Sequence, residues 1–204
     1  MTRMKTPAFF DAVPPIVVFD PLAEALGAAE DGIVEYRYAD AVKLAGHSCP
    51  TVACAWLMTR RALRELYPDT LPRRGDVRVE LRAASEEGVT GVIASIAGLV
   101  TGAANEGGFK GLAGRFGRRG LLRFGVPLGG EIRFTRLDTG HSVTLSHELR
   151  VVAQPPGLRE RLREAFAPDA SNDARKAFAA VWQNWVKTIL IGHADDPKLI
   201  AAAV

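Results

Sequence analysis

The spacing of apolar residues along the chain predicts both helices and strands. Apolar side chains recur on one stripe at helical spacing from Thr51 to Leu66, whereas Asp76 to Ala83 alternates apolar and charged residues as a half-buried strand does. Two more alternating segments, Glu131 to Arg136 and Ser142 to Arg150, are joined by a short Asp- and Gly-containing connection, which predicts a hairpin. The pattern therefore predicts an α+β fold in which helices pack on an antiparallel sheet.

The C-terminal part of the chain has a helical pattern throughout. Pro155-Pro156-Gly157 marks a boundary, after which we expect helices over Leu158 to Phe166, Asn172 to Leu190 and from Pro197 to the end. The middle helix carries an aromatic stripe at i, i+4 and i+7, formed by Phe178, Trp182 and Trp185. Such a stripe indicates packing on the core or on a partner subunit. We therefore divide the chain into a mixed core of residues 1–154 and a helical extension of residues 155–204.

A glycine-rich basic loop, Gly102 to Gly120, follows an apolar helix expected from Val89 to Val100. Glycines allow backbone N–H groups to approach an anion, and four cations add positive charge: Lys110, Arg115, Arg118 and Arg119. The loop matches neither the P-loop nor the dinucleotide-binding pattern. Two interpretations remain open, namely a solvated mobile loop and a cradle for an anionic small molecule.

Composition narrows the class of protein without naming a chemistry. Of the 204 residues, 48% are hydrophobic and 24% are charged, which is typical of a folded protein. The net charge of +3 is too small to indicate a nucleic-acid-binding protein by itself, and no apolar run reaches the ~18 residues of a membrane span. Asp11, Pro14 and Pro15 interrupt the apolar start of the chain, which argues against a signal peptide. With only two cysteines and no disulfide framework, we expect a cytoplasmic protein.

The segment Gly46-His47-Ser48-Cys49-Pro50 carries the clearest chemistry. Cys49 comes immediately before a predicted helix, and Pro50 suits the first helical position. Unpaired N–H groups at a helix N-terminus favour a thiolate over a thiol. In a non-helical linker, His47 at position i−2 can point the same way as Cys49 and bind the same soft metal ion. Alternatively, His47 is a polar residue flanking the helix and Cys49 a small buried hydrophobe.

The remaining cysteine and the other histidines are weaker candidates. Cys54 lies one turn into the same helix, where it is either a small core residue or a third sulfur ligand or resolving thiol. His141 and His147 share the apolar face of their predicted strand and are interpreted as core or edge residues. His193 follows a predicted helix C-terminus, where a cation suits the helix dipole.

The segment from Ala39 to Leu66 resembles the Gly-His-x-Cys-Pro segment of the FmdE family, whose name comes from one of the subunits of formylmethanofuran dehydrogenase. Ile96 to Leu112 is similar to the family's later helix, which ends in Thr-Gly and a loop containing glycine and lysine. The resemblance covers roughly residues 33–150. It implies an α+β metal-binding domain that usually holds zinc, is often a homodimer, and uses His47 and Cys49 as its ligand pair.

Several positions depart from the family pattern. Ala45 stands where the family often has another histidine, Thr51 replaces a glycine, and Ala103 or Ala104 replaces a cysteine. The Cys-x-x-Cys pairs of the zinc-ribbon tail found in some members are absent from the sequence. A site with two or three protein ligands and open positions is therefore easier to build than a closed four-ligand zinc site.

Three function classes follow from these residues. The first is a cytoplasmic FmdE-like protein that binds zinc or another divalent transition metal through His47 and Cys49. In this class the basic loop lies beside the metal and holds an anionic small molecule, and the sequence leaves open whether the protein is an enzyme. The second is a haem- or redox-responsive module in which Cys49 supplies an axial thiolate. The third is a nucleic-acid-binding domain that uses the arginine-rich loop, and the low net charge argues against it.

Overall fold

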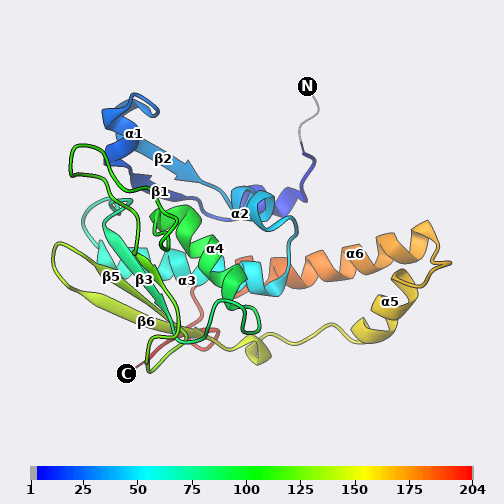
Figure 1. Cartoon of the computed structure of the whole chain (residues 1–204). Coiled ribbons are helices and arrows are strands. Elements are labelled where there is room, and N and C mark those ends of the chain that lie inside the picture. The colour runs from blue at the N-terminus through cyan, green and yellow to red at the C-terminus, as the bar shows by residue number, and fades with distance from the viewer. Residues whose placement is uncertain (1–3, 204) are drawn as a thin grey trace.

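The computed structural model describes residues 4–203 and has an α+β fold (Figure 1). The helices are α1 (Pro21–Ala25), α2 (Tyr38–Ala45), α3 (Pro50–Leu66), α4 (Thr90–Thr101), α5 (Leu158–Ala165) and α6 (Asn172–Lys187). The strands are β1 (Ile16–Phe19), β2 (Ile33–Tyr36), β3 (Val77–Leu81), β4 (Leu122–Arg123), β5 (Ile132–Arg136), β6 (Ser142–His147) and β7 (Ile200–Ala202). Short 3-10 turns occupy Ala8–Ala12, Glu30–Gly32 and Leu149–Val151, and a π-helical turn occupies Thr188–Gly192.

Five strands form one sheet in the order β4-β3-β5-β6-β7, and β1 and β2 form a separate antiparallel ribbon. Only the β3–β4 pair is parallel within the larger sheet. The predicted hairpin is confirmed as β5 and β6, with Ile132 opposite Leu145 and Phe134 opposite Val143. These four side chains are buried, so the alternating pattern places one face of the hairpin in the core.

Two neighbouring helices cover the sheet. α3 packs against β5, β6 and β7, α4 packs against β3, and the two helices contact each other. The alternating apolar residues of β3 meet these helices, and Val79 and Leu81 are fully buried. Trp56 in the middle of α3 is also fully buried, and it lies edge-on to Tyr38 of α2. The stripe predicted from Thr51 to Leu66 is thus the central packing face of the protein.

The predicted C-terminal extension is helical only in part. α5 and α6 form as expected, and Ser171 is the N-cap of α6, since its hydroxyl accepts a hydrogen bond from the Ala174 N–H at 3.1 Å. The prediction of a helix from Pro197 to the end is wrong, because Ile200–Ala202 forms β7 and pairs with β6. The segment Ile200–Ala203 has no helical periodicity, and the open edge of β6 supplies backbone partners for it.

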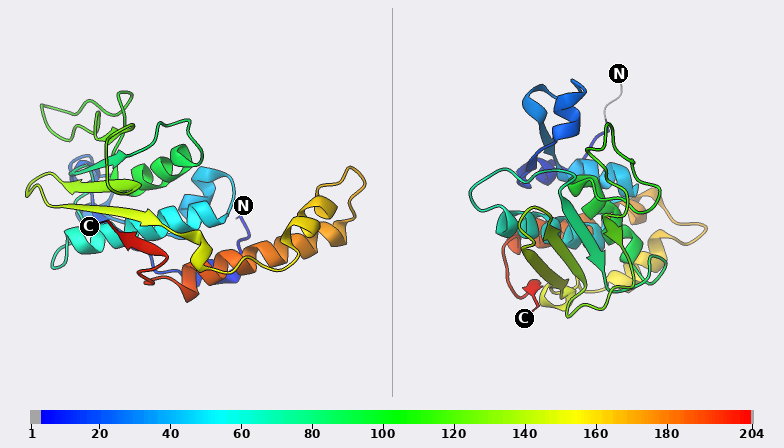
Figure 2. Two further views of the ribbon diagram at one scale, coloured as in Figure 1. Left: turned by 90° about the horizontal axis from the view of Figure 1, so that it is seen from below. Right: turned by 60° about the vertical axis from the view of Figure 1, so that its left-hand side comes forward.

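The α5–α6 hairpin projects from the sheet-and-helix core (Figures 1 and 2). Its aromatic stripe runs outward from the core, beginning at Trp185, which is 8% exposed. Trp182 and Phe178 continue the stripe, and Phe178 contacts Phe166 just after the end of α5, with ring centroids 5.6 Å apart. The stripe therefore packs on the core at one end and against the end of α5 at the other.

Among the helices of residues 4–203, none has the length and apolarity that crossing a bilayer requires.

Candidate functional site

A tight turn between α2 and α3 presents the Gly-His-Ser-Cys-Pro segment. Gly46 ends α2 with φ +75°, a left-handed conformation that glycine adopts without strain, and its N–H donates to the Val42 carbonyl at 2.9 Å. Cys49 is the N-cap of α3 and has extended backbone angles, and Pro50 is the first helical residue. The Val52 N–H donates to the Cys49 Sγ at 3.5 Å. The prediction that Cys49 lies just before a helix is confirmed.

His47 is exposed on this turn, and one of its ring nitrogens is engaged. Its Nδ1 lies 2.9 Å from the carbonyl oxygen of Ala45. A carbonyl oxygen only accepts hydrogen bonds, so Nδ1 carries the proton in this arrangement. In the neutral ring, Nε2 then carries the lone pair, which is the tautomer that a metal-ligating histidine uses when a backbone carbonyl orients it.

Ser48, between the two candidate ligands, ties the turn to α6. Its carbonyl oxygen accepts hydrogen bonds from Trp182 Nε1 at 2.9 Å and from Gln183 Nε2 at 3.2 Å. Its hydroxyl lies 3.0 Å from the hydroxyl of Tyr38, which is fully buried. These contacts fix the backbone from which His47 and Cys49 project. The sequence identified the aromatic stripe on α6 but gave no signal for this contact, which joins residues more than 130 positions apart.

A cavity of about 800 Å³ opens between the N-terminus of α3 and the α5–α6 hairpin. Its apolar lining comes from Pro50, Leu149, Leu158, Leu162, Trp182 and Trp185, and Cys49 contributes to the same wall. Polar side chains also line it: Gln154, Arg159, Glu160 and Arg163. His47 is not among the lining residues. Of the two candidate ligands, Cys49 alone therefore lines this cavity.

The donor set around this turn limits the kind of metal site that fits. Within residues 4–203, no three His, Cys, Asp or Glu side chains come together as a metal-binding group. A closed four-ligand zinc site therefore does not fit this chain. His47 and Cys49 offer one nitrogen and one sulfur donor, a pair that suits a borderline-soft ion whose other positions are filled from outside the protein.

Cys54 is placed as a core residue. Its side chain is fully buried in α3, and it does not line the cavity. Burial raises the pKa of the Cys54 thiol to about 12, and the nearby Glu131 carboxylate acts in the same direction. The side chain is thus a neutral thiol at pH 7, whereas an attacking group must be a thiolate. These observations favour its interpretation as a small hydrophobe.

The four cations of the glycine-rich loop have separate environments. Arg118 is buried and forms an ion pair with Asp20, Arg119 pairs with Glu106 at 2.7 Å, Arg115 lies over the Phe116 ring, and Lys110 is exposed. None of the four lines the Cys49 cavity, so the prediction that the loop lies beside it is wrong. The buried Asp20 carboxylate holds the loop against the N-terminal segment, at the other end of the molecule from α5 and α6 (Figure 2).

Two of the remaining histidines have carboxylate partners. His147 Nδ1 lies 2.6 Å from Glu131 Oε2, and His193 Nδ1 lies 2.8 Å from Asp196 Oδ2. His141 is exposed and comes directly before β6. None of the three lines the cavity beside Cys49. His147 and His193 have structural contacts, as expected, whereas His141 is exposed before β6 and does not lie on the apolar face predicted for it.

No family model, no curated protein and no solved structure matches this chain. The FmdE resemblance accordingly remains a prediction that rests on the segments Ala39 to Leu66 and Ile96 to Leu112. What the structure adds is the environment of the turn: a helix N-terminus, a carbonyl-oriented imidazole and a large apolar cavity.

We expect the two cysteines to differ sharply in reactivity. In the native protein at pH 8, iodoacetamide should modify Cys49, which is partly exposed, and leave Cys54, which is fully buried with a raised pKa. Intact-mass measurement and peptide mapping should find one modified thiol per chain, and two after unfolding in urea. Modification of both thiols at equal rates in the native protein would contradict the placement of Cys54 in the core.

Proposed function

We propose that this protein binds a divalent transition metal, with zinc the ion best suited, through His47 and Cys49 at the N-terminus of α3. The observation that carries the proposal is the turn itself. One residue separates a half-buried thiol at a helix N-cap from an imidazole whose Nδ1 is held by a backbone carbonyl. The helix N-terminus favours the thiolate, and the carbonyl favours the tautomer with a free Nε2 lone pair.

Two protein donors leave most of the coordination sphere open. A metal held in this way binds more weakly than a structural zinc ion and exchanges its other ligands. Such an ion supplies Lewis acidity, and the protein's own part is to position a partner molecule beside it.

The cavity supports an organic partner with an apolar body and an anionic end. Trp182 and Trp185 offer aromatic faces, and the volume of about 800 Å³ lies within the range of small-molecule and cofactor sites. Arg159 and Arg163, both on α5, line the same cavity and are suited to a carboxylate. Because Cys49 lies in the wall of this cavity, a molecule held there would reach an ion on its sulfur.

Metal analysis of variants tests this proposal. In equilibrium dialysis against a fixed concentration of zinc or cobalt, the wild type should bind about one ion per chain, and His47→Ala and Cys49→Ala should each lose most of this binding. The cobalt form should also show a thiolate-to-metal absorption band, which Cys49→Ala abolishes. Cys54→Ala and His141→Ala are the matched controls, because one removes a buried thiol and the other an exposed imidazole. Equal metal content in all five proteins would show that the turn only starts a helix.

A second candidate, haem binding, is favoured by the size and aromatic lining of the cavity. Cys49 would supply the axial thiolate, Trp182 and Trp185 would pack against the ring, and Arg159 and Arg163 would meet its carboxylates. Adding haemin to the same set of variants separates the two candidates. Haem binding predicts a Soret band that Cys49→Ala changes and His47→Ala leaves intact, because only Cys49 lines the cavity.

A further inference from the structure

A second, smaller cavity lies at the other end of the protein and is lined by four arginines. It has a volume of about 250 Å³, and its lining includes Arg73, Arg74, Asp76, Arg115, Phe116 and Arg118. The arginines come from two places in the chain: the segment before β3 and the glycine-rich loop. The fold thus gathers cations that the sequence shows as separate groups.

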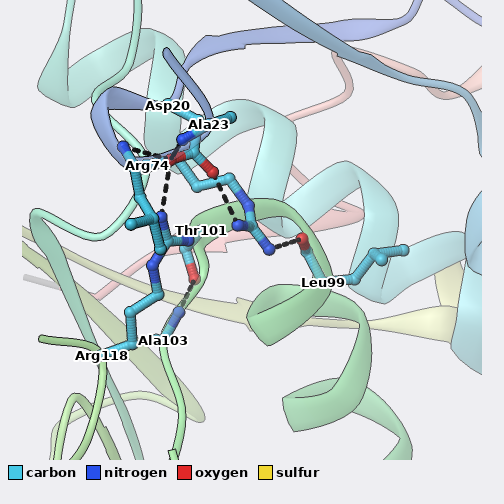
Figure 3. Close-up of polar contacts among 8 residues, drawn as sticks. Asp20, Ala23, Arg74, Leu99, Thr101, Ala103 and Arg118 are labelled. Carbon is cyan, nitrogen blue, oxygen red and sulfur yellow. Dashed lines mark hydrogen bonds and ion pairs between the residues drawn. The ribbon is translucent and has the colours of Figure 1, made fainter. Parts of the chain in front are cut away.

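Positive charge exceeds negative charge around this cavity. Arg74 and Arg118 share the single carboxylate of Asp20, at 2.9 and 2.7 Å, as Figure 3 shows. Arg73 pairs with Asp76 at 2.5 Å. Arg115 lies over the Phe116 ring, 4.8 Å from its centroid, and forms no ion pair with a carboxylate of residues 4–203. Four guanidinium groups therefore face two carboxylates, which leaves two positive charges without a counter-charge.

Arg115 is exposed, whereas the excess charge of Arg74 and Arg118 is largely buried, and not all the N–H donors of these two side chains are used. The Arg118 side chain is 8% exposed and that of Asp20 is 7% exposed. Within the described residues, Nε and Nη1 of Arg118 and Nε of Arg74 are buried and have no hydrogen-bond partner. Two largely buried cations that share one carboxylate are only partly compensated, and each unpaired buried donor adds to the cost. An anion held in the cavity would supply the missing negative charge.

The backbone around Arg118 is shaped to admit its guanidinium. Gly75 and Gly102 lie against it, with φ values of +92° and +75°. A Cβ atom at Gly102 would overlap Arg118 Nη1 and lie 3.2 Å from Cζ, and one at Gly75 would lie 3.4 Å from Nε. These two glycines allow the side chain to reach Asp20 while it lines the cavity. The arrangement is therefore built into the fold and is not a chance meeting of surface side chains.

We propose that this cavity binds the phosphate group of a small phosphate monoester. A phosphate dianion matches the two excess positive charges, and its oxygens accept from planar guanidinium groups in pairs. A volume of about 250 Å³ leaves room for the phosphate and a small organic part. A nucleic-acid strand fits less well, because Arg118 is buried and the net charge of the whole chain is only +3. This site is independent of the proposed metal site, since no residue lines both cavities.

Calorimetric titration of the full chain with inorganic phosphate and with glycerol 3-phosphate tests the proposal. Both should bind saturably, and Arg115→Gln should weaken each affinity by roughly tenfold, the effect of losing one charge-assisted hydrogen bond. Arg119→Gln is the matched control, because it removes the same charge from the same loop, but Arg119 does not line the cavity. Arg115 has no ion pair with the described residues, so Arg115→Gln is expected to leave the thermal unfolding midpoint nearly unchanged.

Two results would overturn the proposal. One is the absence of saturable binding of either phosphate compound at low ionic strength. The other is an equal loss of affinity in Arg115→Gln and Arg119→Gln, which would indicate a general attraction to the basic loop. A single-stranded oligonucleotide is titrated in parallel as a control. If it binds more tightly than glycerol 3-phosphate, and if Arg115→Gln and Arg119→Gln weaken its binding equally, the loop is assigned to nucleic acid instead. Tighter binding of glycerol 3-phosphate, reduced only in Arg115→Gln, supports the proposed site.

Discussion

Replacing Asp20 with asparagine should lower the free energy of unfolding by about 3–5 kcal/mol, the usual cost of removing one partner from a buried ion pair. The change leaves Arg74 and Arg118 without their shared carboxylate, although both side chains are largely buried. Asparagine caps a helix as well as aspartate does, so the hydrogen bonds to the first turn of α1 are retained. The loss therefore reports the charge and not the cap.

Urea unfolding at pH 7 measures this effect, and Asp138→Asn is the control. Asp138 also forms an ion pair with an arginine, Arg136, at 2.7 Å, but its side chain is 56% exposed. Solvent-exposed pairs contribute little to stability, so this variant should unfold almost as the wild type does. Similar losses in the two variants would contradict the description of Asp20 as the centre of a buried cluster.

Acid should weaken the same cluster. Burial alone would raise the pKa of Asp20, but the hydrogen bonds from the Ala23 N–H, Arg74 and Arg118 outweigh it and hold that pKa below its usual value of 3.8. The unfolded chain then binds this proton more readily than the folded one, so stability declines as pH falls below about 4. The difference between wild type and Asp20→Asn should accordingly be largest near neutral pH and shrink on acidification.

Gly102→Ala is expected to lower the free energy of unfolding by about 3 kcal/mol, through left-handed backbone strain and the displacement of a buried side chain. The φ of Gly102 is +75°, and an added Cβ would overlap the end of Arg118. The guanidinium can move away only by giving up its contact with Asp20 at 2.7 Å. The backbone strain and the lost ion-pair geometry therefore add together.

Gly140→Ala separates these two contributions. Gly140 has φ +74°, almost the same as Gly102, but an added Cβ there meets no atom within 4 Å. This variant should lose only the cost of the left-handed conformation, about 1 kcal/mol. Urea unfolding of both variants gives the difference directly. If the two losses are equal, the glycine at position 102 serves the backbone alone, and its closeness to Arg118 has no energetic importance.

Local patterns predicted most of the secondary structure. The α3 stripe and the β5–β6 alternation each depend on residues a few positions apart, and each was found as expected. β7 was missed because the apolar residues at its position have no period, and only the free edge of β6 decides their conformation. Local patterns are therefore informative wherever the deciding contacts are also local.

The candidate sites show where such patterns stop being informative. The sequence placed Cys49 correctly at the start of α3, because Pro50 and the apolar stripe are adjacent to it. It could not place the glycine-rich loop, because the partner of Arg118 is Asp20, 98 positions earlier. Nor could it pair the cations of that loop with the arginines before β3. Long-range pairing of charges thus decided which residues share a cavity.

The hydrogen bonds from Trp182 and Gln183 to the Ser48 carbonyl affect the order in which the protein can mature. During synthesis the Gly46–Pro50 turn leaves the ribosome long before α6 does. Until α5 and α6 emerge, the turn lacks the contacts that fix its backbone, and the cavity beside Cys49 has only one wall. β7 pairs with the sheet later still, because it follows α6 in the chain. The cavity beside Cys49 is therefore completed only when α6 has packed, and a product truncated before that helix would leave this thiol without the wall that Trp182 and Trp185 form.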